Sequence, residues 1–225
     1  MKKLRTILCT VAGALIIFSL CGCYNGGTFT NKSYKTEAKN VNSVVIDVSD
    51  REIETVVSED GQIRIDYCES EKEYYDISVS ESGTLSMSLV LDKEWTDFIG
   101  TKPSAKYRKI VLYIPDGTLQ TLKIKTTNEK IAVSPVSVIE SADFYSQGGD
   151  IGFERIAVGK SLTAEVKNGN ITGKITGGWD DFSIVCEIKK GNSNLPERKT
   201  EGEKSLTAKC NNGNIQIDFI DESLL

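Results

Sequence analysis

The sequence has no histidine in its 225 residues. Histidine is the usual general base and a common metal ligand at neutral pH, so its absence excludes Ser-His-Asp triads and His-based metal sites. The adjacent pairs Glu59-Asp60 and Asp180-Asp181 are no substitute. Neighbouring residues on a strand point to opposite faces, whereas a glycosidase needs two carboxylates that face one cleft. We therefore predict no catalytic residues, no cofactor and no enzymatic activity.

Cysteine is scarce in the body of the chain. Only Cys68, Cys186 and Cys210 follow residue 23, and an odd number is a poor disulfide framework. Cys186 and Cys210 fall in neighbouring columns of the repeat described below, where diagonal partners lie roughly 7–8 Å apart, too far for a disulfide. The fragment Gly148-Gly149-Asp150 is not repeated as a calcium-binding array would be. The sequence predicts buried free thiols and no metal site.

Basic residues are also fewer than acidic residues. The chain has 27 Lys and Arg against 32 Asp and Glu, a net charge of −5. Residues 1–22 contain three basic and no acidic residues, so removing them leaves 24 against 32, a net charge of −8. An acidic body without a basic stripe argues against nucleic acid and against a polybasic membrane patch.

The N-terminus contains an apolar run that is short for a membrane span. A basic start, Met1-Lys2-Lys3-Leu4-Arg5, precedes it, and this pattern is typical of a secretory signal. The run ends Leu20-Cys21-Gly22-Cys23, which resembles the lipobox of bacterial lipoproteins. The resemblance implies a signal peptide over residues 1–22 and acyl chains such as palmitate on Cys23. The protein would then be anchored in the cell membrane on its extracytoplasmic face.

A polar stretch follows the lipobox. Residues 23–40 contain Gly26-Gly27 and many Thr, Asn, Ser and Lys residues, a composition typical of a flexible tether. We expect one folded domain over residues 41–225, which is long enough to bury a core.

A repeated corner organises the second half of that domain. Ile131, Ile151 and Ile171 stand 20 residues apart, and each follows a small polar turn. The turn positions step by 20, 20, 22 and 22 residues and are Glu129, Gly149, Gly169, Gly191 and Gly213. Glycine suits such a corner because it adopts a positive φ without strain. Gly149, Gly169, Gly191 and Gly213 are therefore predicted structural corners.

The segments between the corners alternate apolar and polar residues, which predicts strands. An antiparallel sandwich or meander also fits, because Asn-Gly between alternating strands is a strong hairpin signal. Equal periods with matching columns favour stacking instead: Ala164, Cys186 and Ala208 share one column. A lone coil buries too little apolar surface to offset its lost backbone entropy, so coils must stack. We predict an all-β solenoid, or β-roll, with rungs of about 20–22 residues.

Residues 92–108 interrupt the strand pattern and contain three aromatic residues, Trp95, Phe98 and Tyr107. A fourth, Trp179, lies beside Gly177-Gly178. Exposed aromatics near polar groups suit sugar rings or protein anchors, so these four are candidate binding residues. Alternatively, the long segment folds back to cap an open end of the solenoid.

These features together resemble a known family. The strand Val111-Leu112-Tyr113-Ile114-Pro115, the Leu122-x-Ile124 strand and the serial Gly-Asp/Asn-Ile corners resemble the putative adhesin family of bacterial surface lipoproteins. The resemblance covers roughly residues 41–219. It implies a β-solenoid-like domain in a surface protein and supplies no catalytic residues.

Three functions are consistent with these observations. The favoured one is a non-enzymatic surface lipoprotein that presents a β-solenoid for adhesion or envelope scaffolding, with a surface glycan or an envelope protein as partner. The second is a partner-binding sensor module in an envelope stress response. The third, a polysaccharide-active enzyme, would require carboxylates that converge in one groove.

Overall fold

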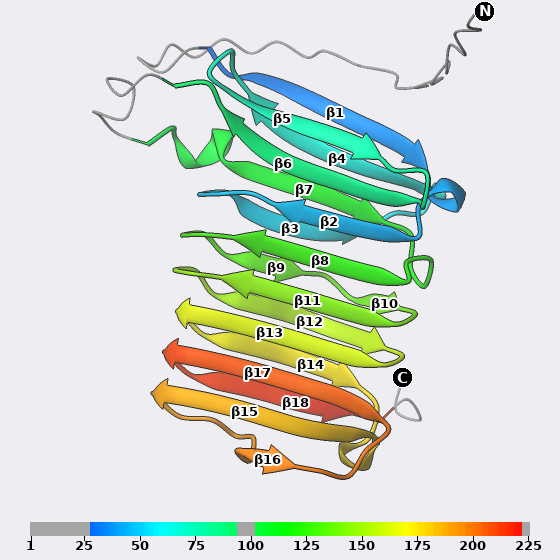
Figure 1. The fold of residues 1–225 in the computed structure, drawn as a ribbon, viewed down its shortest axis with the longest axis vertical. Helices are drawn as coiled ribbons and strands as arrows, with labels where there is room; N and C mark the ends of the chain where they lie inside the picture. Colours follow the sequence, from blue (N-terminus) through cyan, green and yellow to red (C-terminus); the bar gives the residue numbers. More distant parts are fainter. Residues whose placement is uncertain (1–27, 94–101, 222–225) are drawn as a thin grey trace, which may run out of the picture.

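The computed structural model describes residues 28–93 and 102–221. In this part of the chain, strands form two sheets that face each other and run across the long axis of the molecule (Figure 1). The described 3-10 helices are Ala38–Asn40, Ala105–Tyr107 and Trp179–Asp181. None of the helices within these ranges is long and apolar enough to cross a membrane. The predicted signal peptide and Cys23 lie outside the described residues.

Each sheet is named here by its strands in spatial order. The first sheet contains β1 (Thr30–Glu37), β4 (Gln62–Glu69), β7 (Lys109–Ile114), β3 (Glu52–Val57), β9 (Ile131–Val133), β12 (Ile151–Val158), β14 (Ile171–Thr176) and β18 (Ile215–Ile220), and β10 (Val136–Val138) also pairs with β12. The second sheet contains β16 (Arg198–Lys199), β15 (Phe182–Lys190), β17 (Lys204–Asn212), β13 (Ser161–Asn168), β11 (Ser141–Ser146), β8 (Thr121–Thr126), β2 (Ser43–Asp47), β6 (Thr84–Leu91) and β5 (Glu73–Val79).

From β8 to β14 the chain winds in coils, each of which contributes first to the second sheet and then to the first sheet. Neighbouring coils pair in parallel, with equivalent positions opposite each other: Ile124 pairs with Phe144, and Phe144 pairs with Ala164. All three side chains are buried, as period-2 alternation requires. This parallel register confirms the predicted β-solenoid and is incompatible with an antiparallel meander in this region.

The last two coils stack out of sequence order. β13 pairs with β17, and β17 pairs with β15, so the coil that comes later in the chain is inserted inside the earlier one. The column predicted from Ala164, Cys186 and Ala208 exists, but its spatial order is Ala164, Ala208, Cys186. Residues 191–203 follow β15 and cover the end of the stack: β16 pairs with β15, and Ser193 bridges to Ile215 of β18.

The same inversion occurs at the other end. β2 lies between β6 and β8, and β3 lies between β7 and β9, although β2 and β3 come first in the chain. Beyond them the pairing becomes antiparallel: β5 with β6, β4 with β7, and β1 with β4 (Figure 1). The N-terminal end is therefore a small antiparallel cap on a parallel solenoid.

The boundary predicted for the tether is wrong for residues 30–40. Residues Thr30–Glu37 form β1, paired with β4 over its full length, and Ala38–Asn40 form a 3-10 helix. The polar composition that indicated a tether is that of an edge strand, in which lysines discourage pairing with other chains. The folded body thus includes Thr30 and does not begin at Val41.

One continuous apolar core fills the space between the sheets, from Ala38 to Ile217. Each fully buried Ile or Leu stabilises the fold by about 1.5–3 kcal/mol, and a coil gains this only from the coils above and below it. The C-terminal end is closed by the segment 191–203, in which Leu195 is buried. There Asn194 Nδ2 donates to Ile217 O (2.8 Å) and Asn194 Oδ1 accepts from Ile217 N–H (3.0 Å). The backbone of Asn192 and Asn194 also hydrogen-bonds to Ile215, so a short bridge and one amide side chain together take the place of a further strand beside β18.

Candidate functional site

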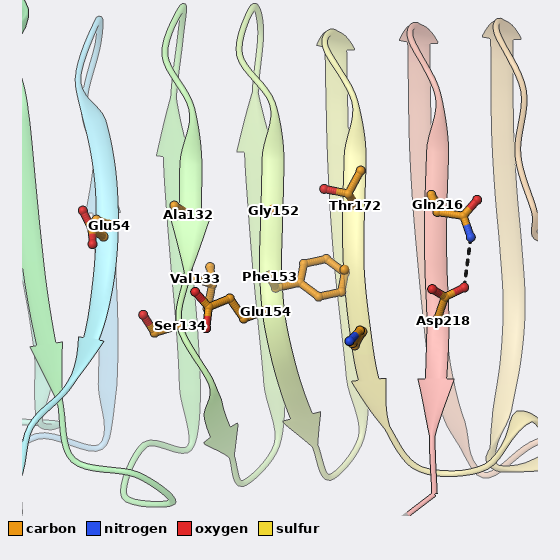
Figure 2. Close-up of a pocket in the computed structure, with 12 residues that line it drawn as sticks. Glu54, Ala132, Val133, Ser134, Gly152, Phe153, Glu154, Thr172, Gln216 and Asp218 are labelled. Atoms are coloured by element: carbon orange, nitrogen blue, oxygen red, sulfur yellow. Dashed lines mark hydrogen bonds between the residues drawn. The ribbon is translucent and has the colours of Figure 1, made fainter.

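The outer face of the first sheet carries a shallow hollow (Figure 2). Strand register places Glu54, Ala132, Gly152, Thr172 and Gln216 side by side in one row across five strands. The residues in the middle of the row, Ala132 and Gly152, have small side chains or none, and the side chains at its two ends, Glu54 and Gln216, are larger. The hollow that results has a volume of about 590 Å³.

The floor of the hollow depends on a glycine. Phe153 points into the core, is buried, and extends its ring toward β14, as Figure 2 shows. Its partner in register is Gly173, where a Cβ would overlap the Phe153 ring. The missing side chain at Gly173 therefore provides the volume that the ring occupies.

The next outward row supplies charge to the hollow. Glu154, Lys174 and Asp218 are exposed and line it, and Lys174 is the register partner of Asp218. Gln216 Nε2 donates to Asp218 Oδ1 at 2.9 Å. Donors and acceptors thus alternate along an open, rigid surface. Such a surface can hydrogen-bond the hydroxyl groups of an extended polar ligand.

A ladder of amides continues this surface around the corner of the solenoid. The Asn170 backbone N–H donates to Asp150 Oδ1 (2.7 Å), the Asn214 N–H to Asn170 Oδ1 (2.9 Å), and the Asn192 N–H to Asn214 Oδ1 (2.9 Å). These four side chains line a second hollow of about 600 Å³. It shares Thr172 and Gln216 with the first, so the two hollows form one surface, which we call the ladder groove.

The predicted corner glycines lie directly behind this ladder. Gly169, Gly191 and Gly213 have φ values of 153°, 133° and 145°, which L side chains rarely adopt. Gly149 has no positive φ, but a Cβ there would overlap the backbone of Glu129 in the coil below. A Cβ at Gly213 would likewise overlap the Gly169 carbonyl oxygen. Glycine is needed at these corners as much for close stacking as for backbone conformation.

The described residues offer little for catalysis around this groove. Among them no three His, Cys, Asp or Glu side chains are grouped so that they could hold a metal ion. The carboxylate pairs noted in the sequence lie apart from the groove: Asp60 accepts from Ser58 Oγ and Gln62 N–H, and these hydrogen bonds lower its pKa. Asp181 accepts from the Gly178 N–H at 2.8 Å. Both arrangements are turn hydrogen bonds.

Comparison with known proteins agrees with this architecture. Residues 41–148 match the family model described as Toastrack DUF4097, over slightly less than half of the chain. A solved structure of a putative cell adhesion protein from Clostridium sporogenes superposes on 84% of this chain and 99% of its own, with a TM-score of 0.57. These findings confirm the resemblance to the putative adhesin family.

Sequence identity to the solved structures is low. Identity to the Clostridium sporogenes structure is 10%, so that likeness shows the fold alone. A putative adhesin from Bacteroides fragilis, 13% identical, covers 84% of this chain and 97% of its own, but its TM-score of 0.37 is too low to carry an argument. No curated protein matches the chain.

The Toastrack match ends before Trp179, the one candidate aromatic that the structure shows well exposed, at 42%. Its ring meets Phe219 edge to face, with centroids 5.4 Å apart, and Lys199 Nζ lies 5.8 Å from the ring. Trp179 lies in the 3-10 helix before β15 and does not line the ladder groove. A binding role for it stays a prediction.

The other aromatic candidates lie near the N-terminal end. Tyr107 is half-buried and stacks on the buried Phe29, with ring centroids 5.0 Å apart and planes 12° apart. This contact gives Tyr107 a packing role in the cap. Trp95 and Phe98 lie outside the described residues.

The same cap contains a buried charge cluster that was not predicted from the sequence. Arg51 is 2% exposed, forms an ion pair with the equally buried Glu73, and donates from Nε to Tyr75 OH at 2.7 Å. Lys93 Nζ contacts the other Glu73 oxygen at 2.5 Å. Burial lowers the pKa of Arg51, but Tyr75 and Glu73 outweigh it and the net shift is upward. Arg51 therefore stays charged, and its contacts link the residue before β3 to Glu73 and Tyr75 of β5.

Cys186 and Cys210 lie on the inward face of their strands, as the repeat predicts, and Cys68 lies in β4, outside the repeat. Cys68, Cys186 and Cys210 are all buried and free. Burial raises the pKa of Cys68 and of Cys210, which keeps both thiols protonated and unreactive at neutral pH.

Proposed function

We propose that this chain is a non-enzymatic surface protein, lipid-anchored through Cys23 on the extracytoplasmic face of the cell membrane, that binds a surface glycan along the ladder groove. The Toastrack match and the adhesin-like fold support a surface protein. The lipobox residues Leu20, Gly22 and Cys23 support the anchor.

The observation that carries the proposal is the ladder groove itself. Small residues open a long hollow across five strands, and amides and carboxylates line it in register. A glycan chain presents hydroxyl groups at regular intervals, and hydrogen-bonding groups repeated at the strand spacing of about 4.8 Å can meet several of them at once. The stacked coils hold this array rigidly, which lowers the entropy cost of binding.

The test is binding of the protein from Tyr24 onward to purified cell-wall glycan, host-type glycans and isolated envelope. Gly152→Phe fills the hollow: the nearest atom to an added Cβ is Thr172 Oγ1 at 3.7 Å, so the fold tolerates the substitution. Thr163→Phe makes a similar addition to the outer face of the second sheet and serves as the control. We expect Gly152→Phe to reduce glycan affinity at least tenfold and Thr163→Phe to leave it unchanged.

Two results would redirect the proposal. Glycan binding that Trp179→Ala abolishes and Gly152→Phe does not would move the adhesive site to the C-terminal end. Absence of binding to every glycan, together with capture of an envelope protein, would favour scaffolding over adhesion. Mass spectrometry of the exported protein, compared with Cys23→Ala, tests the anchor separately.

A further inference from the structure

A third hollow, separate from the two that form the ladder groove, lies on the outer face of the first sheet at the N-terminal cap. Its volume is about 550 Å³, and β1, β4, β7 and the 3-10 helix Ala105–Tyr107 contribute its lining. One carboxylate, Asp66, is among the lining residues. Five cationic side chains also line the hollow: Lys32, Lys35, Arg64, Lys106 and Lys109. We call this surface the basic hollow.

Partial pairing leaves the basic hollow positive. Arg64 lies 3.3 Å from Asp66, Lys32 lies 3.6 Å from Glu69, and Lys109 is paired with Glu54. Lys35 and Lys106 also line the hollow, and Lys35 interacts electrostatically with Asp60. The five cations outnumber the four carboxylates near them, Asp66, Glu69, Glu54 and Asp60. The sequence argued against a basic membrane patch because its basic residues are dispersed in an acidic chain. The fold gathers five of them from three strands and a 3-10 helix, and this local positive surface suits an anionic partner.

The position of the basic hollow in the chain indicates which anion it binds. Asn31 lines it and lies eight residues after Cys23, a distance that extended chain spans in at most about 28 Å. If Cys23 carries the anchor, as proposed above, the basic hollow is held close to the bilayer surface. Electrostatic attraction to the bilayer surface acts within about 8 Å at physiological salt. The short connection to Cys23 allows the basic hollow to come within that distance of the surface.

We infer that the basic hollow docks against the phosphate headgroups of anionic phospholipids. The contact places the N-terminal cap against the membrane. The ladder groove begins next to the basic hollow, at Glu54, the ion-pair partner of Lys109, and runs along the same sheet toward the other end of the solenoid. The lipid anchor holds the protein at the bilayer, and the basic hollow adds an electrostatic contact that fixes the orientation of the cap. This inference rests on the proposed anchor for its geometry, but headgroup binding can be measured without the anchor.

The experiment uses the protein from Tyr24 onward, which contains every described strand and lacks the anchor. Its partition to vesicles of phosphatidylcholine is compared with vesicles that also contain phosphatidylglycerol. The test variant is Lys35→Gln with Lys106→Gln. The matched control, Lys167→Gln with Lys189→Gln, removes the same charge from exposed positions on β13 and β15.

We expect binding to phosphatidylglycerol vesicles that weakens as salt rises, and no binding to phosphatidylcholine. The Lys35/Lys106 variant should partition roughly 30-fold more weakly and the control variant less than twofold more weakly. Equal binding to both vesicles, or equal losses in both variants, would overturn the inference. Competition by millimolar inorganic phosphate would also overturn it, because it would reveal a site for free phosphate.

The two variants distinguish a failure of headgroup binding from a failure of the proposed glycan binding. Gly152→Phe should abolish glycan binding and leave vesicle partition unchanged, while the Lys35/Lys106 variant should do the reverse. An unmodified Cys23 with intact vesicle binding would remove the anchor and retain the headgroup contact.

Discussion

The middle of the solenoid and its two ends are stabilised by different means. In the middle, identical positions stack in register, the corners are glycines, and the buried side chains are almost all aliphatic or aromatic. At the N-terminal end the strands run antiparallel and enclose an ion pair, Arg51 with Glu73. At the C-terminal end, an asparagine side chain and a short segment replace the next coil.

The difference follows from what each region packs against. An inner coil is covered by neighbours of its own kind, so repetition alone satisfies its apolar residues and its strand edges. A terminal coil lacks one neighbour and has to satisfy exposed strand edges with other groups. Specific polar contacts therefore gather at the ends, and disruption of each region should have a different signature.

The largest effect is expected from a corner glycine in the middle. Gly213→Ala places a Cβ against the Gly169 carbonyl oxygen at a φ of 145° and should lower the free energy of unfolding by about 3–5 kcal/mol. Gly61→Ala is the control: its φ is 70° and its Cβ would meet nothing within 4 Å, so it should cost about 1 kcal/mol. Urea denaturation measures both. Equal losses would show that backbone conformation, and not close stacking, sets the corner requirement.

The buried ion pair at the N-terminal end comes next. Arg51→Met leaves Glu73 buried with Lys93 as its charged partner among residues 28–93 and 102–221, and we expect a loss of about 3 kcal/mol. Adding Glu73→Gln to Arg51→Met removes the stranded charge and should recover part of that loss. A double-mutant cycle by chemical denaturation tests this, and additive losses would contradict coupling between the two residues.

A smaller effect at the same end depends on pH. Burial, with a contribution from Glu69, raises the pKa of Tyr67 to about 12. The unfolded chain ionises this tyrosine near pH 10, so the folded state loses stability as the pH rises above 10. Between pH 9 and 11 the wild type should lose about 1.4 kcal/mol more than Tyr67→Phe. Parallel pH profiles of the two proteins would contradict the assignment.

The smallest effect is expected at the C-terminal edge. Asn194→Ala removes the two hydrogen bonds to Ile217 and should cost about 1 kcal/mol. It also uncovers the edge of β18 at Ile217, beyond the backbone bridge to Ile215, so sedimentation should detect association that increases with protein concentration. Glu197→Ala, on the same segment, is the control and should change neither property.

The sequence by itself determined the repeating part of this protein. A side-chain period of two and a corner every 20–22 residues specify strands, columns and glycine corners, because those features depend only on residues close in the chain. The columns that contain Cys186 and Cys210 follow from the same spacing and are present in the structure. The hollow beside Gly152 also follows from register, although nothing in the spacing indicated that it was a groove.

Only the tertiary structure decided the order of the coils and the nature of the ends. The spacing of corners is the same whether Ala208 stacks inside or outside Cys186, so the inversion is invisible in the sequence. A polar segment such as Thr30–Glu37 becomes a strand because β4 offers it an open edge. The basic hollow exists because Lys35, Arg64 and Lys109, far apart in an acidic chain, meet on three adjacent strands. Local periodicity fixes what each coil is, and long-range packing fixes where it lies and what its surface presents.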